Sequence, residues 1–152
     1  MDFTQVLREE IMDLQMEAKD KDEALRKLVD LLEKAGAIES CEGFLKDVME
    51  RESEGPTGIG NYIAIPHGKS KYVKQTSVAL AKLKEPISWE TLDGKPVKII
   101  FLFAVPNNDE TNHNHLKLLS QLAGILSYDE AQEKLLSVQD KGQVINIFES
   151  RK

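Results

Sequence analysis

One short segment of the chain combines two glycines with a histidine that directly follows a proline. Gly58 and Gly60 allow positive φ and a close backbone approach. Pro66 fixes the backbone just before His67, and Gly68 removes a side chain that would otherwise crowd the imidazole ring. We therefore expect a stiffly mounted, accessible histidine at the end of a short buried strand, where the sites of α/β domains usually lie.

A neutral imidazole is nucleophilic at one ring nitrogen near pH 7, so His67 is suited to carrying a phosphoryl group. A hydrogen bond to the other ring nitrogen has to fix the tautomer. We expect a backbone carbonyl near Gly68 or His115 to accept that bond. A histidine at a strand end is more often structural than functional, so this hypothesis needs support from other residues.

Arg51 and His115 are the two side chains that we expect to complete such a site. Arg51 lies at the end of a predicted helix, before the glycine turn, and its planar guanidinium matches the oxygens of a phosphoryl group. The alternative is a solvated arginine paired with Glu50 or Glu54. His115 begins the apolar face of another predicted helix. It is either a half-buried structural residue or, when protonated, a second positive charge for the phosphoryl group.

Other chemistries are less well supported. The glycine pair lacks the Gly-Lys-Ser/Thr ending of a phosphate-binding P-loop and the third glycine of a dinucleotide site, so we expect no nucleotide cofactor. His113 and His115 invite a metal-dependent hydrolase, with His67 or Asp109 as the third ligand. At a helix start, however, residues i and i+2 point to different sides. We therefore expect no metal, and this hypothesis ranks last.

The elements that must position these residues alternate between strands and helices. The pattern predicts strands at 11–16, 62–65, 76–83 and 98–105. It predicts one helix from a capping box at Asp20 and Glu23 to Gly36, and others at 41–50, 112–126, 129–137 and 140–149. The side chains expected to point inward include Phe44, Leu45, Val48 and Met49 in the second helix, and Leu118, Leu119, Leu122, Ala123 and Leu126 in the third. Such alternation predicts an α/β domain with a mixed sheet.

Composition excludes several classes of function. The chain has 152 residues, of which 41% are hydrophobic and 30% are charged, as in a globular protein, and no linker or repeat divides it. Its net charge of −6 argues against a nucleic-acid partner and against docking on anionic membranes. It shows no secretory signal and no apolar run of membrane-spanning length. A lone cysteine, Cys41, fits a reducing compartment, so we expect one cytoplasmic domain over residues 1–152.

Several motifs together resemble a known family. The chain is similar to the enzyme IIA domains of the fructose/mannitol class in the bacterial phosphoenolpyruvate-dependent sugar phosphotransferase system. The resemblance rests on Arg51-Glu52, 57–60, 63–68, 86–89, Asp93-Gly94, 97–106 and 115–119. It covers nearly the whole chain from Ile11 onward and assigns no role to the first ten residues.

The resemblance implies a fold, a function and a set of partners. The fold is an α/β sandwich whose mixed, mainly parallel sheet lies between helices. His67 is the phosphorylated residue, His115 lies beside it and Arg51 helps to hold the phosphoryl group. The donor is the phosphocarrier protein HPr, and the acceptor is an enzyme IIB domain, through which the chain associates with a sugar permease. The rival interpretation is a regulator of the nitrogen/potassium-control type, whose phosphorylation state modulates partner proteins.

Overall fold

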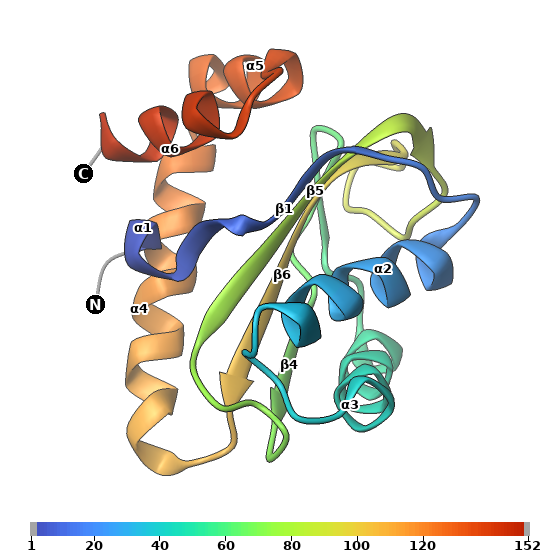
Figure 1. Cartoon of the computed structure of the whole chain (residues 1–152). Coiled ribbons are helices and arrows are strands. Elements are labelled where there is room, and N and C mark those ends of the chain that lie inside the picture. The colour runs from blue at the N-terminus through green and yellow to red at the C-terminus, as the bar shows by residue number, and fades with distance from the viewer. Residues whose placement is uncertain (1–2, 151–152) are drawn as a thin grey trace.

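The computed structural model describes residues 3–150, of which 109–114 are described by their backbone alone. The strands are β1 (Leu7–Met16), β2 (Gly58–Gly60), β3 (Ile63–Ala64), β4 (His67–Ser70), β5 (Ser77–Ile87) and β6 (Val97–Pro106). The helices are α1 (Phe3–Val6), α2 (Lys21–Lys34), α3 (Cys41–Glu54), α4 (Asp109–Leu126), α5 (Asp129–Ser137) and α6 (Lys141–Glu149). Figure 1 shows their arrangement around the sheet.

Within the described residues, the six strands form one sheet. Its order is β1-β5-β6-β3-β2, and β4 pairs with β6 further along the same edge as β3. The pairs β1–β5, β3–β6 and β4–β6 are parallel, whereas β2–β3 and β5–β6 are antiparallel. This arrangement confirms the expected mixed, mainly parallel sheet.

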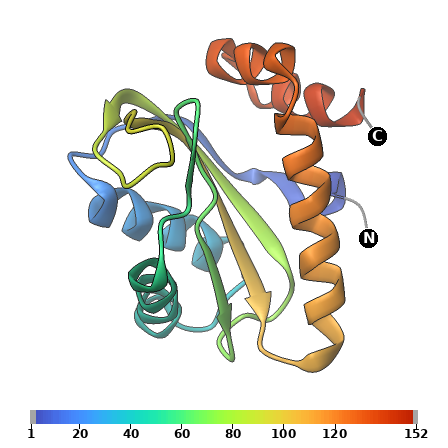
Figure 2. The same ribbon diagram turned by 180° about the vertical axis from the view of Figure 1, so that it is seen from behind.

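Helices cover both faces of the sheet, and each face has its own core. Side chains of β6 alternate between the two. Phe101 and Phe103 pack in the cluster that includes α4, α5 and α6, while Ile100 and Leu102 pack in the cluster that includes α2 and α3. Figures 1 and 2 show α4 on one side of the sheet and α2 with α3 on the other. The site therefore lies in a three-layer α/β/α frame.

The N-terminal residues, which the sequence pattern left without a role, belong to the first of these cores. Phe3 is 2% exposed, and its ring centroid lies 4.8 Å from that of Phe148 and about 6 Å from those of Phe101 and Phe103. β1 begins at Leu7, four residues before the predicted strand, because Leu7 already pairs with Val78 of β5. The start of the chain thus closes the core between the sheet and α6.

The predicted helices are all present, but α1 was not predicted, α4 begins three residues before its predicted start at 112, and α3 and two side chains also differ. The Asp20 carboxylate caps α2 by accepting from the backbone N–H of Glu23, as expected. α3 continues four residues past its predicted end, to Glu54, and so carries Arg51 on its last turn. Met49 (36% exposed) and Ala123 (exposed) were predicted to point inward, which is wrong. Each lies just outside the strip of its helix that faces the sheet.

The short strand before His67 is interrupted, which corrects the expected position of the histidine. β3 ends at Ala64, and Pro66 has no N–H with which to continue the ladder. Its carbonyl still accepts from the N–H of Phe103 at 3.0 Å, and pairing with β6 resumes at His67. His67 is therefore the first residue of β4 and does not end the preceding strand.

Gly68 has a packing role that the sequence pattern did not predict. A Cβ atom at this position would lie 2.7 Å from Phe44 Cε1 and 2.7 Å from Val48 Cγ2. Both contact residues belong to the buried side of α3. The missing side chain therefore lets α3 pack closely on β4.

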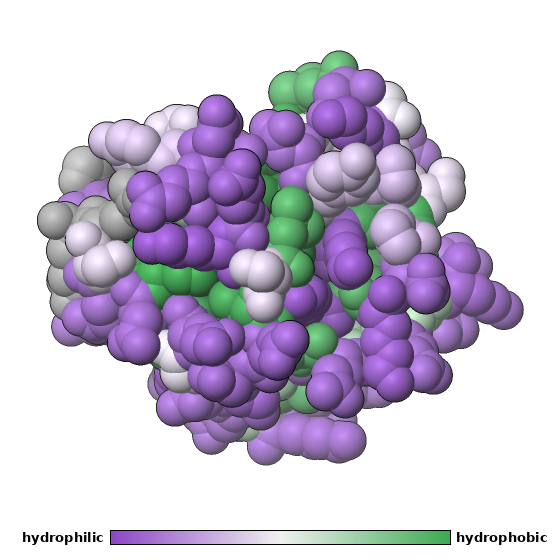
Figure 3. Space-filling view, turned by 90° about the horizontal axis from the view of Figure 1, so that it is seen from above, coloured by the Kyte–Doolittle hydropathy of each residue, from purple (hydrophilic) through white to green (hydrophobic). Residues whose placement is uncertain are grey.

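Polar side chains cover most of the surface seen from above, and apolar side chains appear mainly in the hollow between the polar groups (Figure 3). Among the described residues, no helix combines the length and apolarity required to cross a bilayer.

The close packing at Gly68 generates a prediction about stability. We expect Gly68→Ala to lower the free energy of unfolding by about 1–3 kcal/mol, because the added methyl group overlaps Phe44 and Val48. Gly124→Ala is the matched control, since its Cβ meets nothing within 4 Å and it lies inside α4. That change should stabilise the protein by about 0.5–1 kcal/mol. Urea unfolding measures both free energies of unfolding. Equal changes in Gly68→Ala and Gly124→Ala would contradict the close packing of α3 on β4.

Candidate functional site

The imidazole of His67 is half-buried and held at both nitrogens. Nδ1 lies 3.3 Å from the carbonyl oxygen of Ile65, and Nε2 lies 3.1 Å from Nε of Arg51. A carbonyl can only accept a hydrogen bond and a guanidinium can only donate one. The two contacts therefore assign the proton to Nδ1 and the lone pair to Nε2. The carbonyl that fixes the tautomer belongs to Ile65, which corrects the expectation that it lies near Gly68 or His115.

Arg51 reaches this ring because it shares the buried side of its helix. Phe44, Val48 and Arg51 follow the i, i+4, i+7 spacing of one helix face, and the first two pack against β4. The guanidinium donates through Nε to His67 and through Nη1 to the carbonyl of Gly55 at 3.2 Å. These contacts replace the alternative in which Arg51 pairs with Glu50 or Glu54.

His115 approaches the same ring from the other side of the sheet. Its ring centroid lies 5.4 Å from that of His67 and 5.9 Å from that of Phe103. Leu118 and Leu122, one and two turns further along α4, pack in the core cluster opposite to that of α3. Arg51 and His115 thus come from helices on opposite faces. The structure brings all three predicted residues together.

One nitrogen of His115 is left without a partner. Nε2 is buried and makes no hydrogen bond to any of the described residues. A buried polar atom without a partner costs free energy, so such an atom in a site usually awaits a ligand. The atom lies on a ring adjacent to that of His67, so a group bound to His67 is within range to supply the missing contact.

Burial and nearby charge keep both rings neutral at pH 7. The pKa of His67 is lowered mainly by burial, which the hydrogen bond to Ile65 partly offsets, and further by the charge of Arg51. Burial, and then the charges of His67 and Lys69, lower the pKa of His115 to about 4. In the unphosphorylated protein His115 is therefore neutral, so a positive charge on it would have to come with the phosphoryl group. Arg51 is a permanent cation at the His67 ring.

Only part of the ligand set considered for a metal lies among the side chains that the structure describes. The side chains of His113 and Asp109 lie outside the described residues. Among the side chains that are described, no three histidine, cysteine, aspartate or glutamate residues lie close enough to hold a metal ion.

Sequence reasoning missed two residues beside the site. Glu52 follows Arg51 in α3 and is buried, and its carboxylate accepts a hydrogen bond from the hydroxyl of Thr57. The spacing of Phe44, Val48 and Glu52 at i, i+4 and i+8 places Glu52 on the buried side. This spacing could have revealed that Glu52 is buried, but the predicted helix ended at residue 50, before Glu52.

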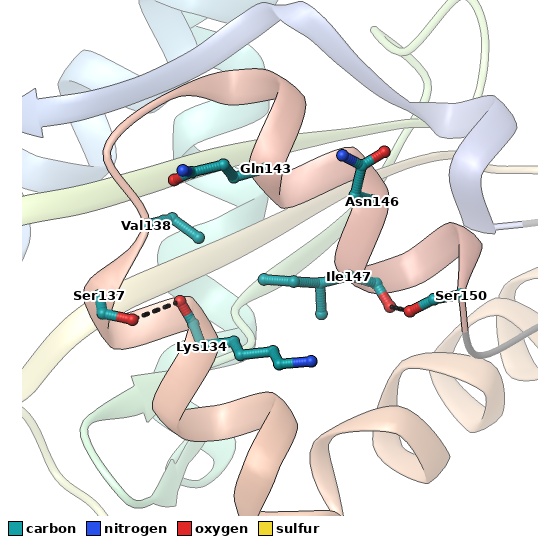
Figure 4. A pocket seen from close by; sticks show the side chains of 7 residues that line it. All are labelled: Lys134, Ser137, Val138, Gln143, Asn146, Ile147 and Ser150. Carbon is teal, nitrogen blue, oxygen red and sulfur yellow. Dashed lines mark hydrogen bonds between the residues drawn. The ribbon is translucent and has the colours of Figure 1, made fainter.

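One hollow of the surface, of about 420 Å³, lies between α5 and α6 and is shown in Figure 4. Two of its hydroxyls are already used, because Ser137 donates to the carbonyl of Lys134 and Ser150 donates to that of Ile147. α5 and α6 lie at one end of the sheet, and β4 lies toward the other (Figure 1). This hollow therefore has no part in the histidine site.

Comparison with known proteins places the chain in a family. Residues 5–151 match the family model described as phosphoenolpyruvate-dependent sugar phosphotransferase system, EIIA 2. The chain is 32% identical over 148 residues to the fructose-specific EIIABC component of Bacillus subtilis. It is 33% identical over 147 residues to the fructose-specific EIIA component of Haloferax volcanii. These alignments cover 97% of the chain in both cases, but 23% of the first relative and 94% of the second.

A solved structure agrees with these relatives. The nitrogen regulatory protein IIA-Ntr from Neisseria meningitidis superposes with a TM-score of 0.88 at 34% identity, covering 95% of this chain and 97% of that one. The family match and the shared fold confirm the resemblance inferred from the motifs around His67. The chain belongs to the EIIA 2 family of the phosphoenolpyruvate-dependent sugar phosphotransferase system.

Proposed function

We propose that this chain is a phosphoryl carrier, which accepts a phosphoryl group from phospho-HPr on Nε2 of His67 and passes it to an enzyme IIB domain for sugar uptake. The observation that carries the proposal is the pair of contacts at the imidazole. The Ile65 carbonyl holds the proton on Nδ1, and the Arg51 guanidinium lies at the lone pair of Nε2. The ring is therefore held as a neutral nucleophile with a cation at its reactive nitrogen.

The transfer step follows from this geometry. The Nε2 lone pair forms a bond to phosphorus while the bond from phosphorus to the donor's nitrogen breaks and its electron pair returns to the donor. The His67 ring keeps its Nδ1 proton and gains positive charge, which the Ile65 carbonyl stabilises. Arg51 exchanges its contact with Nε2 for contacts with the phosphoryl oxygens, where positioning and charge stabilisation account for most of the catalysis.

His115 changes its state when the phosphoryl group arrives. Its buried Nε2 has no partner among the described residues, and a phosphoryl oxygen is the partner that its position suits. The added negative charge raises the pKa of His115 from about 4 toward its ordinary value. The site thus gains a hydrogen-bond donor once it is loaded.

The rest of the proposal concerns the setting of the site. The chain acts as one EIIA domain over residues 1–152, works in the cytoplasm and meets a permease through the IIB domain. The Bacillus subtilis relative, named an EIIABC component and about four times longer, supports an association of EIIA with B and C parts. The similarity to IIA-Ntr supports regulation of partner proteins as a second candidate function. Transfer to a IIB domain distinguishes the two.

A phosphorylation assay tests the carrier function. With phosphoenolpyruvate, enzyme I and HPr, we expect the wild-type chain to take up one acid-labile phosphoryl group, and His67→Ala to take up none. Arg51→Ala should slow uptake about 100-fold with the fold intact, because the site loses its cation. Arg51→Lys should recover only part of the rate, since an ammonium lacks the planar fork. Label retained in His67→Ala would refute the assignment.

The low pKa of His115 predicts a pH effect on stability. The unfolded ring has its ordinary pKa of 6.5, whereas the folded ring titrates at about 4. Between these values the unfolded chain binds a proton that the folded chain does not, so the free energy of unfolding falls as the pH is lowered. From pH 7 to pH 5, wild type should lose about 1 kcal/mol more than His115→Gln, allowing for screening of a half-exposed ring.

Urea unfolding at both pH values measures this difference, and a histidine NMR titration gives the pKa directly. An equal loss in wild type and His115→Gln, or a His115 pKa of 6.5 or above in the unphosphorylated protein, would show that the ring is not held neutral by burial.

A further inference from the structure

A buried carboxylate lies beside the reactive pair and takes no part in the transfer step described above. The side chain of Glu52 is 3% exposed. Oε1 accepts a hydrogen bond from the Thr57 hydroxyl, and Oε2 lies 2.7 Å from Nζ of Lys21. A buried ion pair contributes little net stability compared with an apolar pair of similar size. Its fixed geometry therefore suggests a role in orientation.

A continuous line of hydrogen bonds runs from this carboxylate to the ring of His67. The Thr57 hydroxyl binds Glu52, and the Thr57 carbonyl accepts from the N–H of Ile65 at 2.9 Å. The carbonyl of Ile65 in turn holds Nδ1 of His67 at 3.3 Å. Thr57 is itself only 6% exposed, so water has little access to this line. Glu52 thus holds Thr57, and Thr57 holds Ile65, whose carbonyl fixes the tautomer of His67.

The same carboxylate anchors the helix that carries Arg51. Glu52 is the next residue in α3, and Lys21, to which it is paired, begins α2. Lys21 also pairs with Glu90 at 2.9 Å and lies 5.1 Å from the ring centroid of Trp89. The end of α3 is therefore tied to a second helix and to the segment before β6.

We propose that Glu52 is a positioning residue that sets the reactive geometry of His67 and Arg51 together, with Thr57 linking it to the ring and Lys21 linking it to the frame. The part of this inference that concerns rates rests on the proposed carrier function. The part that concerns the His67 tautomer does not. His67 and Arg51 are both connected to the Glu52 carboxylate. A substitution of Glu52 therefore alters the position of the imidazole relative to the guanidinium without removing either group.

The decisive comparison is between two substitutions of Thr57. Thr57→Val keeps the shape of the side chain but removes the hydroxyl, whereas Thr57→Ser keeps the hydroxyl. We expect Thr57→Val to slow phosphoryl uptake from phospho-HPr about tenfold, because misplacement at a reacting centre is costly. Nitrogen-15 NMR of the unphosphorylated ring should show a smaller share of the Nδ1–H tautomer of His67. Thr57→Ser should restore both the rate and the tautomer.

A second pair of variants separates positioning from charge. Glu52→Gln should slow uptake by a similar factor, because the amide cannot serve the Thr57 hydroxyl and the Lys21 ammonium as the carboxylate does. Glu90→Gln is the control, since it removes an exposed carboxylate from the same lysine and leaves the link to Thr57 intact. Its rate should stay within about twofold of wild type.

The outcomes are distinct. A wild-type tautomer and rate in Thr57→Val would overturn the inference, as would equal effects of Glu52→Gln and Glu90→Gln. If Thr57→Val does not fold, the comparison of Glu52→Gln with Glu90→Gln decides the question. A wild-type chain that takes up no phosphoryl group would instead refute the carrier function. The tautomer measured on the unphosphorylated variants would still test the role of Glu52.

Discussion

The close approach of α3 to β4 is the constraint on which the site depends. A guanidinium and an imidazole nitrogen 3.1 Å apart need a helix and a strand that lie almost in contact. Gly68 makes this possible, because any side chain there would overlap Phe44 and Val48. The same helix face then carries Arg51 to the ring. The contact between α3 and β4 therefore both packs the core and places Arg51 at the His67 ring.

The electrostatics of the site suit a group that must be both received and released. Both imidazoles are neutral before transfer, and burial is the main cause in each case. The Arg51 guanidinium meets the incoming charge at Nε2 of His67. Interactions that tighten only when the group arrives speed transfer without trapping the product. Nε2 of His115, which has no partner among the described residues, fits that requirement, because in the proposed function it gains a contact only in the loaded state.

Much of the frame and the identity of the three central residues could be predicted from the sequence. Local signals were sufficient where structure is local, as at the Asp20 cap of α2 and in the apolar run that forms β6. Local signals failed where tertiary contacts determine the length of an element or the state of a side chain. α3 extends through a polar stretch because the Glu52 carboxylate is paired in the interior. The Ile65 carbonyl is only two residues from His67, but no periodicity shows that the ring turns toward it. The neutral state of His115 depends on burial and on His67 and Lys69, which lie far away in the chain.

The position of the phosphoryl group on the imidazole tests the central claim most directly. The carbonyl of Ile65 reserves Nδ1 for a proton, so phosphorus has access to Nε2 alone. Phosphorus–nitrogen couplings in the phosphorylated, nitrogen-15-labelled protein identify the bonded atom. The account predicts coupling to Nε2 of His67 with a proton retained on Nδ1. Coupling to Nδ1 would contradict it.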